Sequence, residues 1–388
     1  MKFKLILMLA ATLLLQNVFA QVSKLNMLDP QHLELQKKNY QQGKPDVVNA
    51  VNIIIKTADS FLNDKPGSVM QKAFTPPSGS KHDYMSLAPY FWPNPATKDG
   101  LPYIRKDGQR NPEIRKITDH ERQSELADRC KYLSLAWYFT GDQKYAAKAS
   151  QLLSAWFIDP DTKMNPNLNY AQAIRGVNEG RGIGIIETLA LVRLTDWISL
   201  LQGAQSFPNQ NLDAIKSWYK QYINWMMTSK NGRDEHNAKN NHGTHYDTQL
   251  AGFALFTGNK TLARQVLNDS KKRIALQIEP DGRQPLELAR TNAYGYSTFN
   301  LNGWCNMALL GERAGVDLWH YATPDGRSMH KAIDWLIPYA FEEKPRDRSQ
   351  ISPYHKSDMY LMLILAAKQY HDDSYAKRAA TLPKNDEN

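Results

Sequence analysis

Cysteine is scarce: only Cys130 and Cys305 occur in the 388 residues. This scarcity excludes a disulfide-rich scaffold, and the two positions do not have the spacing of a cysteine-based zinc motif. Each cysteine lies within an apolar helical pattern. We therefore expect two buried thiols, with a Cys130–Cys305 disulfide as the alternative that an oxidising compartment would permit.

Long apolar runs are also absent after the first twenty residues. Residues 1–20 begin with Lys2 and Lys4, continue through an apolar run and end Val-Phe-Ala before Gln21, as a cleavable signal peptide does. No later run approaches the roughly 20 residues needed to span a bilayer. We predict cleavage after Ala20, export to a bacterial periplasm, and a single catalytic domain over residues 21–388. No cysteine follows the cleavage site to carry a lipid anchor.

Acidic residues are fewer than basic ones, 39 against 48, which gives a formal net charge of +9. The 42% hydrophobic and 22% charged content is that of a globular protein and excludes long disorder, collagen and coiled coil. The positive charge suggests a polyanionic partner. Export makes nucleic acid a poor candidate, and loss of the two signal-peptide lysines would leave a charge of +7. No protein partner is evident.

Alternating strand patterns are rare, and paired helical patterns replace them. Leu126, Cys130 and Leu133 form one apolar stripe that ends at Gly141, and Asp142 precedes a second stripe. Comparable hairpins recur around 256–259 and around 361–376. Recurring helical hairpins without a regular repeat length predict an all-α fold, an (α/α) toroid of six or seven hairpins. Segments 75–112, 165–182 and 229–244 are predicted as loops that form a substrate groove.

Nucleotide-binding motifs are missing as well. The glycine-rich segment 175–184 is not preceded by a strand and is not followed by Gly-Lys-Ser/Thr. We interpret Asn178 and Arg181 in this segment as polar residues that face the groove. No cofactor is predicted.

The most unusual polar motif is Asn240-Asn241-His242, which precedes an apolar helix beginning near Gln249. The field of a helix N-terminus favours anions and a neutral histidine that can accept a proton. The simpler interpretation makes the asparagines helix caps and His242 a polar loop residue. A metal site formed by His242, His245 and Asp247 matches no common zinc spacing, so no metal is predicted.

A second motif combines Arg290 with Tyr294 and Tyr296, which follow it by about one and nearly two helical turns. A cation beside a phenol lowers the pKa of the phenol, which suits a tyrosine that exchanges a proton. The simpler interpretation buries both tyrosines and pairs Arg290 with Glu287.

A third motif is a proline- and aromatic-rich strap, residues 83–113, which contains Tyr90, Trp92 and Arg105. Aromatic rings could stack on sugar faces, and Arg105 or Lys106 could bind carboxylates. A strap that only packs against the helices is an equal alternative.

Together these motifs resemble the alginate-lyase superfamily of polysaccharide lyases. The resemblance rests on Asn240-Asn241-His242, on Arg290 with the run Tyr296-Ser297-Thr298-Phe299-Asn300-Leu301, and on Tyr90-Phe91-Trp92-Pro93-Asn94-Pro95. It extends over roughly residues 83–367 and is strongest to the alginate and glucuronan lyases of polysaccharide lyase family thirty-eight. Such relatives have an α/α-toroid fold.

The resemblance implies metal-independent β-elimination on a 1,4-linked polyuronate, alginate first and glucuronan next. Asn241, helped by Arg290 and by Asn178 or Arg181, would bind the uronate carboxylate. Tyr296 or His242 would remove the C5 proton, and Tyr296 would protonate the departing O4. The remaining residues that we predict to bind substrate are Asn240, His245, Tyr294, Tyr90, Trp92 and Arg105.

Two choices stay open at the sequence level: Tyr294 competes with Tyr296, and His245 competes with His242. A glycoside hydrolase on the same fold would need two carboxylates across the groove. Glu179, Glu287 and Asp247 are candidates without a visible pairing. A non-catalytic protein that binds acidic polysaccharide is the third hypothesis.

Overall fold

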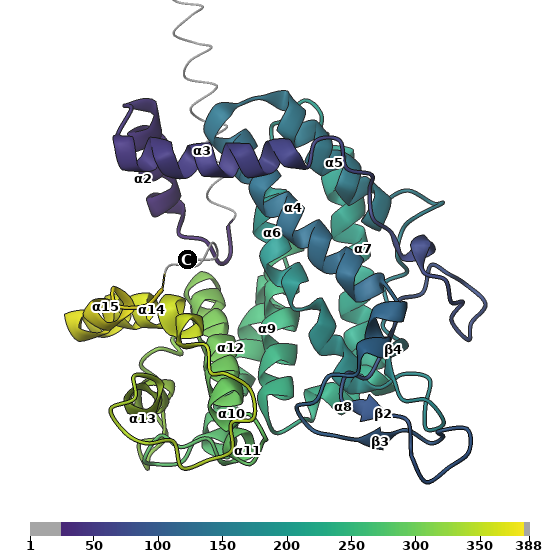
Figure 1. The fold of residues 1–388 in the computed structure, drawn as a ribbon. Helices are drawn as coiled ribbons and strands as arrows, with labels where there is room; N and C mark the ends of the chain where they lie inside the picture. The colour runs from purple at the N-terminus through teal and green to yellow at the C-terminus, as the bar shows by residue number, and fades with distance from the viewer. Residues whose placement is uncertain (1–24, 384–388) are drawn as a thin grey trace, which may run out of the picture. The chain divides into compact units, whose positions relative to one another are not determined.

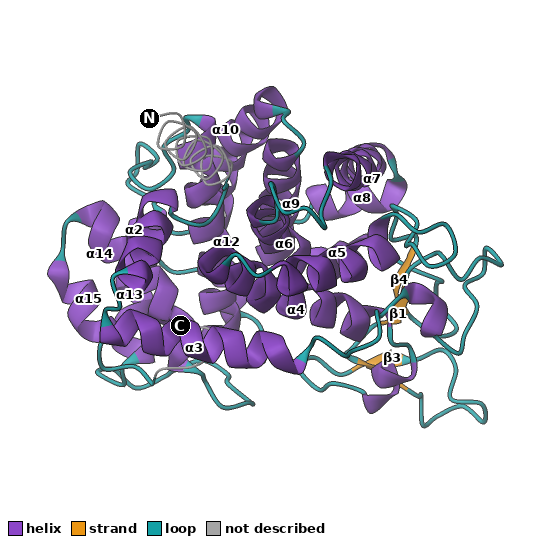
Figure 2. Ribbon diagram, turned by 90° about the horizontal axis from the view of Figure 1, so that it is seen from above, coloured by secondary structure: helices purple, strands orange, loops and turns teal. Residues whose placement is uncertain are grey.

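The structure, a computed structural model, describes residues 25–383. The predicted signal peptide, residues 1–20, lies outside this range. Within it, helices dominate and strands are few and short (Figures 1 and 2). No helix in the described range is long and apolar enough to cross a membrane. Backbone contacts divide the chain into two compact units, each built from three stretches of sequence. The prediction of a single domain over 21–388 stays a prediction.

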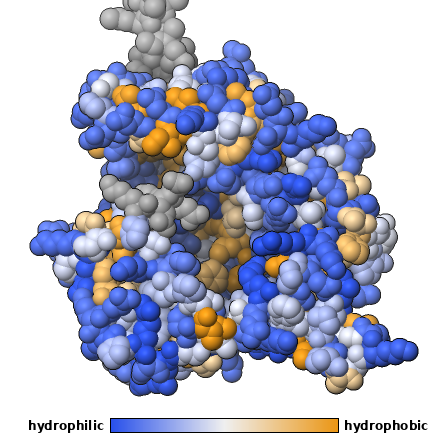
Figure 3. Space-filling view, viewed as in Figure 1, coloured by the Kyte–Doolittle hydropathy of each residue, from blue (hydrophilic) through white to orange (hydrophobic). Residues whose placement is uncertain are grey.

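Unit 1 comprises the described residues up to Ser86 together with Arg115–Tyr170 and Glu187–Trp225. Its helices are α2 (Pro30–Gln41), α3 (Pro45–Ser60), α4 (Asp119–Thr140), α5 (Gln143–Phe157), α6 (Ala190–Leu200) and most of α7 (Asn209–Thr228). It also contains a short 3-10 turn, η1 (Val69–Gln71). Two exposed apolar side chains, Leu35 and Ile53, lie on α2 and α3, where hydrophobic residues gather in Figure 3.

The first predicted hairpin is confirmed as α4 and α5. Leu126, Cys130 and Leu133 are buried along α4. The helix ends at Gly141, whose φ of 72° is easy for glycine and strained for other residues. The side chain of Asp142 then caps α5 by accepting a hydrogen bond from the Lys144 backbone N–H. Local turn chemistry therefore defines this corner.

Unit 2 comprises Leu87–Ile114, Ala171–Ile186 and the described residues from Met226 onward. Its helices are α8 (Lys230–His236), α9 (Asn241–Phe256), α10 (Lys260–Gln277), α11 (Pro285–Leu288), α12 (Ala293–Ala314), α13 (Met329–Ala340), α14 (Tyr360–Tyr370) and α15 (Asp373–Ala379). The helix α9 packs against both α10 and α12 (Figure 1). The α9–α10 and α14–α15 pairs confirm the other two predicted hairpins.

Short strands lie at the strap and at the glycine-rich segment. In the strap, β2 (Phe91–Trp92) pairs antiparallel with β3 (Ile104–Arg105), with Phe91 opposite Arg105. The strands β1 (Met85–Leu87) and β4 (Tyr170–Ala173) are three and four residues long, and just beyond β1 the Ala88 N–H donates to the Ala173 carbonyl. Because β4 ends just before the glycine-rich segment 175–184, the expectation that no strand precedes this segment is wrong. The 3-10 turns η2 (Pro112–Lys116), η3 (Gly182–Thr188) and η4 (Lys356–Met359) complete the elements.

One predicted loop is wrong. Residues 229–244 were expected to be irregular, but α8 occupies Lys230–His236 and α9 begins at Asn241, eight residues before Gln249. The side chain of Ser229 caps α8, and Gly232 lets that helix approach the Met226 carbonyl. A Cβ on Gly232 would lie 1.7 Å from that oxygen. Tertiary packing therefore makes a helix from a polar sequence that resembles a loop.

Both thiols are free and buried, Cys130 in α4 and Cys305 in α12. Burial raises the pKa of each thiol well above its usual value. The expectation of two buried thiols is confirmed, and the alternative of a disulfide is not.

Candidate active site

All of the predicted site residues lie in unit 2. The strap contributes Tyr90, Trp92 and Arg105, and the glycine-rich segment contributes Asn178 and Arg181. The start of α9 contributes the Asn-Asn-His motif, and the link from α11 into α12 contributes Arg290 and the two tyrosines. Segments far apart in sequence thus meet within one compact unit.

Tyr296 is the centre of a phenol–guanidinium cluster. Its hydroxyl accepts a hydrogen bond from Nη2 of Arg290 at 2.8 Å. The same hydroxyl lies 2.9 Å from the hydroxyl of Tyr90 in the strap. The Arg290 guanidinium carbon lies 3.8 Å from the centroid of the Tyr296 ring, so the cation also contacts the aromatic face. The predicted Arg290–Tyr296 pair is present, and Tyr90 completes it.

The pKa of Tyr296 does not follow the sequence-based expectation. Burial and the hydrogen bond with Tyr90 raise the pKa of the Tyr296 phenol well above its usual value, whereas Arg290 acts in the opposite direction. The predicted net lowering of the Tyr296 pKa is therefore wrong. The motif alone indicated the cation but not the burial or the second phenol.

Arg290 is held by Asp107, not by Glu287. Nε and Nη2 of Arg290 donate to the two carboxylate oxygens of Asp107 at 3.1 and 2.7 Å. Burial opposes ionisation of Asp107, but the hydrogen bonds and charge of Arg290 outweigh it and hold the pKa of Asp107 well below its usual value. The alternative that paired Arg290 with Glu287 is therefore wrong.

Glu287 instead binds Asn241. The Asn241 backbone N–H donates to Oε1 of Glu287 at 2.7 Å, and its side-chain Nδ2 donates to Oε2 at 2.6 Å. Both side chains are almost completely buried. Burial raises the pKa of Glu287 despite these two hydrogen bonds. The carboxylate fixes the rotamer of Asn241 and places it at the first residue of α9.

His242 is oriented by a buried carboxylate. Its Nδ1 lies 2.7 Å from Oε1 of Glu235, a side chain of α8 that is 1% exposed. A proton on Nδ1 donated to Glu235 leaves Nε2 of His242 as the free acceptor. Asn240 caps the helix by accepting from the His242 backbone N–H, and Nε2 of Gln277 donates to the Asn240 carbonyl. Asn240 thus caps α9, while Asn241 and His242 are each held by a carboxylate.

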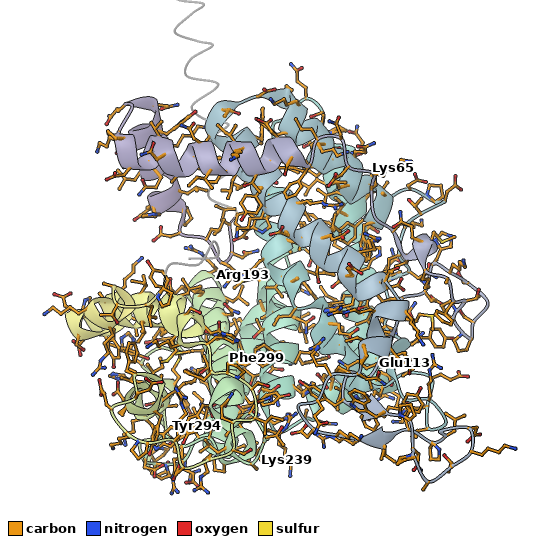
Figure 4. The ribbon with its side chains drawn as sticks, viewed as in Figure 1. Lys65, Glu113, Arg193, Lys239, Tyr294 and Phe299 are labelled. Atoms are coloured by element: carbon orange, nitrogen blue, oxygen red, sulfur yellow. The ribbon has the colours of Figure 1, made fainter. Side chains whose placement is uncertain are left out.

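The two competing residues are in the core. Tyr294 is fully buried, donates its hydroxyl to Asp347 and packs against Trp335 and Tyr339 of α13. Figure 4 shows Tyr294 beside α12 on the side of α13. His245 is 1% exposed, its ring centroid lies 4.1 Å from that of Phe299, and within the described residues its two ring nitrogens have no hydrogen bond of ordinary geometry. These environments favour Tyr296 and His242 as the reactive groups.

The three side chains of the metal alternative, His242, His245 and Asp247, have separate partners. Asp247 accepts two hydrogen bonds from Arg273, at 2.6 and 3.2 Å. His245 packs against Phe299, and His242 binds Glu235. Within residues 25–383 no group of three or more His, Cys, Asp or Glu side chains is arranged to hold a metal ion.

The other predicted substrate-binding residues have structural partners in and around the strap. Oδ1 of Asn178 accepts from the Ile174 backbone N–H, and Arg181 donates to the backbone and side chain of Gln172. Nε1 of Trp92 donates to the Gln109 carbonyl. Arg105 is half exposed and donates to Asp107. A role for these residues in substrate binding stays a prediction.

A family model described as alginate lyase matches residues 68–346, most of the chain. The chain belongs to the alginate lyase family. It is similar to the crystal structure of an alginate lyase from Bacteroides ovatus, with 39% sequence identity over 93% of this chain and 96% of that chain and a TM-score of 0.88. A comparison with curated proteins gave no match.

Two more distant structures share the fold alone. Alginate lyase A1-III from a Sphingomonas species is 16% identical over 85% of this chain and 90% of that chain, with a TM-score of 0.55. A single-substitution variant of alginate lyase A1-III complexed with a tetrasaccharide is 16% identical over 85% of this chain and 89% of that chain, with a TM-score of 0.56. The predicted all-α, α/α-toroid fold class and the predicted polysaccharide lyase activity are confirmed for this family member. Assignment to family thirty-eight stays a prediction.

Sequence reasoning missed two carboxylates of the candidate site, Asp107 and Glu235. Asp107 stands in a Lys-Asp-Gly turn whose composition indicates only a turn. Glu235 precedes His242 by seven residues, but α8 ends at His236 and α9 begins at Asn241, so no continuous helical spacing connects them. Neither residue carries a signal that could have been detected without the tertiary structure.

Proposed function

We propose that this protein cleaves a 1,4-linked polyuronate, alginate first and glucuronan next, by β-elimination that needs no metal. The proton leaves C5 of a uronate, the C4–O4 bond breaks, and a C4=C5 double bond forms at the new non-reducing end. The C5 proton is only weakly acidic because the neighbouring carboxylate resists further negative charge. Neutralising that carboxylate is therefore the first requirement.

Arg290 and Asn241 are suited to neutralise the carboxylate. Arg290 uses Nε and Nη2 for Asp107 and Tyr296, while Nη1 donates in none of those hydrogen bonds. Asn241 has a second hydrogen on Nδ2 beyond the one directed to Glu287. Both groups are held before substrate arrives, so little reorganisation is needed during the reaction.

Tyr296 is suited to protonate the departing O4. Burial and Tyr90 keep its phenol protonated at neutral pH, which is the form that a general acid requires. Arg290 stabilises the phenolate that remains after the proton has moved to O4. The proton count then closes when the phenolate recovers a proton from C5 or from solvent.

The base depends on the stereochemistry at C5. In mannuronate the C5 proton and O4 are syn, so a single tyrosine can serve both: the phenol passes its own proton to O4 while its oxygen accepts the proton from C5, and the phenol is restored. In guluronate they are anti, so a second group must remove the proton. Nε2 of His242 is the candidate, since Nδ1 is directed to Glu235.

One observation carries this proposal: the Tyr296 hydroxyl touches both Arg290 and Tyr90 in a chain that is 39% identical to an alginate lyase. The net charge, +9 for the whole chain and +7 after loss of the two signal-peptide lysines, supports an acidic polysaccharide as partner. Export to the periplasm belongs to the same proposal and rests on the sequence of residues 1–20.

A glycoside hydrolase receives less support. It needs two carboxylates positioned for acid and base or nucleophile roles. Glu287 is taken up by Asn241, Asp247 is paired with Arg273, and Glu179 is exposed. Binding without catalysis remains an outcome of the test that follows.

The test compares two products of the same incubation. The protein is mixed with alginate, glucuronan or a neutral glycan, and the ultraviolet absorbance of unsaturated uronate is followed beside new reducing ends. We expect both signals to rise together on the polyuronates and neither on the neutral glycan. Reducing ends without the ultraviolet signal would mean hydrolysis, and neither signal would mean binding alone. Loss of the lyase signal in EDTA would contradict the metal-free scheme.

A further inference from the structure

Asp107 collects more hydrogen bonds than a surface turn requires. Besides the two from Arg290, it accepts from the Thr291 backbone N–H at 3.3 Å and from Thr291 Oγ1 at 3.0 Å. Nη2 of Arg105 donates to it at 2.7 Å. The exposed fraction of the Asp107 side chain is 20%, and that of the Arg290 side chain is 16%. One carboxylate of the strap thus binds two consecutive residues of the segment that leads into α12.

The backbone at Gly108 and at Ile351 brings Asp107 and Thr291 close together. Gly108 has a φ of 74°, and a Cβ there would lie 2.6 Å from Thr291 Oγ1 and 2.9 Å from Cδ1 of Ile351. Glycine is therefore required both for the turn and for the close approach. On its other side, the Thr291 carbonyl accepts from the Ile351 N–H at 3.0 Å. Thr291 is held between the strap and the segment around Ile351.

Arg290 connects this carboxylate to the phenol, because its Nη2 donates both to Asp107 at 2.7 Å and to the Tyr296 hydroxyl at 2.8 Å. We propose that Asp107 is a positioning residue for Tyr296 that acts through Arg290, fixing the guanidinium against the phenol and offsetting its positive charge. This inference rests on the proposed role of Tyr296 as the proton donor to O4. Without Asp107, the guanidinium would be free to rotate, and its full charge would favour the phenolate.

The charged and titratable groups around the phenol support this electrostatic role. Arg290 lowers the pKa of Tyr296, whereas Tyr90 and Asp107 raise it. Glu287 interacts with Arg290 from the short helix α11. Asp107 has a low pKa and stays charged throughout the neutral range, so its influence on Tyr296 is constant there.

The decisive experiment titrates the phenol without substrate. Tyrosine ionisation is followed by ultraviolet difference absorbance in the wild type and in Tyr296→Phe, and again in Asp107→Asn and Asp107→Asn/Tyr296→Phe. Subtraction within each pair reports Tyr90 and Tyr296 as one coupled unit. We expect the phenolate population at a given alkaline pH to rise at least ~10-fold in Asp107→Asn. The reason is that the Arg290 guanidinium, no longer offset by Asp107, is an opposite charge beside the phenolate, and such a charge shifts a pKa by about 1–3 units.

Turnover gives the second readout. Misplacement of the guanidinium should reduce kcat of Asp107→Asn on mannuronate blocks by ~10²-fold. Its alkaline limb should move to lower pH, a shift that simple loss of packing would not cause. The matched control is Asp325→Asn, since Asp325 also accepts from an arginine Nε and a threonine hydroxyl but lies on the surface. That control should keep both the titration and kcat.

If circular dichroism shows that Asp107→Asn does not fold, Asp107→Glu replaces it as the test variant. It keeps the charge on a longer side chain, so the Tyr296 titration should stay as in the wild type while kcat falls. A folded Asp107→Asn with an unchanged Tyr296 titration, or an Asp107→Glu whose titration moves to lower pH, would overturn the inference. The titration needs no turnover, so failure of the lyase proposal alone would leave its result intact.

Discussion

Three of the four side chains proposed for the reaction are each held by a carboxylate. Asp107 holds Arg290, Glu235 holds His242 and Glu287 holds Asn241. Hydrogen bonds that involve a charged partner contribute about 1.5–3 kcal/mol each. These pairs fix rotamers and tautomers before substrate binds, which is how a site reduces its reorganisation during a reaction.

Glu235→Gln tests the orientation of His242. An amide in place of the carboxylate can donate to Nδ1 and so favour the tautomer that carries its proton on Nε2. We expect turnover of guluronate blocks to fall by at least ~10²-fold, as when a general base is removed, with a much smaller loss on mannuronate blocks. The measurement is kcat on the two homopolymers.

The control is Asp317→Asn, which alters an exposed carboxylate 3.0 Å from Nδ1 of His320. It should leave kcat on both homopolymers unchanged. An equal loss on both substrates in Glu235→Gln would contradict a base role for His242.

The buried His245 should make the free energy of unfolding depend on pH. Burial lowers its pKa to about 3 from the usual value near 6.5, with a smaller contribution from His242. The unfolded chain therefore binds the proton below pH 6.5 while the folded chain does not, so stability is lost as pH falls. The loss between pH 7 and pH 5 amounts to about 2 kcal/mol.

Replacing His245 by leucine should remove that part of the pH dependence. Urea midpoints at pH 7 and pH 5 measure it, with the exposed His355→Leu as control. If the wild type and His245→Leu lose the same midpoint between these two pH values, the neutral buried histidine is not the cause.

At the scale of elements, close packing between α9 and α12 positions the motifs of the candidate site. A Cβ on Gly303 of α12 would lie 2.8 Å from Cε1 of His245 and 3.0 Å from Cγ2 of Thr244, both in α9. A Cβ on Gly295 of the same helix would meet nothing closer than 3.7 Å. The two glycines therefore differ in what they permit, although both lie in α12.

Gly303→Ala should destabilise the protein by about 1–3 kcal/mol because it forces α9 and α12 apart or displaces His245. Gly295→Ala should be neutral or stabilise by up to ~1 kcal/mol, since alanine favours the helix. Chemical denaturation of both variants tests the pair. Equal stability would show that the α9–α12 contact is looser than described.

The helices differ in how far sequence could predict them. The turn at Gly141-Asp142 was predictable because a left-handed residue and a capping aspartate act locally. The helix α8 was not, because it depends on Gly232 meeting the Met226 carbonyl. The site shows the same division: the Arg290–Tyr296 pair is close in sequence, whereas Asp107 is 183 residues from Arg290.

At the scale of the whole molecule, the net positive charge should speed association with an acidic substrate. Raising ionic strength from ~0.01 M to ~0.15 M shortens the screening length from ~30 Å to ~8 Å. We expect KM for alginate to rise over this range while kcat stays nearly constant, because long-range attraction affects association. A salt-independent KM would mean that contacts within the site, not the net charge of +9, govern binding.

The central claim is that Tyr296 transfers the proton to O4, and kcat of Tyr296→Phe on mannuronate blocks tests it most directly. This variant keeps the ring beside Arg290 and removes only the hydroxyl that contacts Arg290 and Tyr90. The account predicts that formation of unsaturated uronate falls by at least ~10²-fold. Full activity in Tyr296→Phe, with loss of activity in Tyr294→Phe instead, would contradict it.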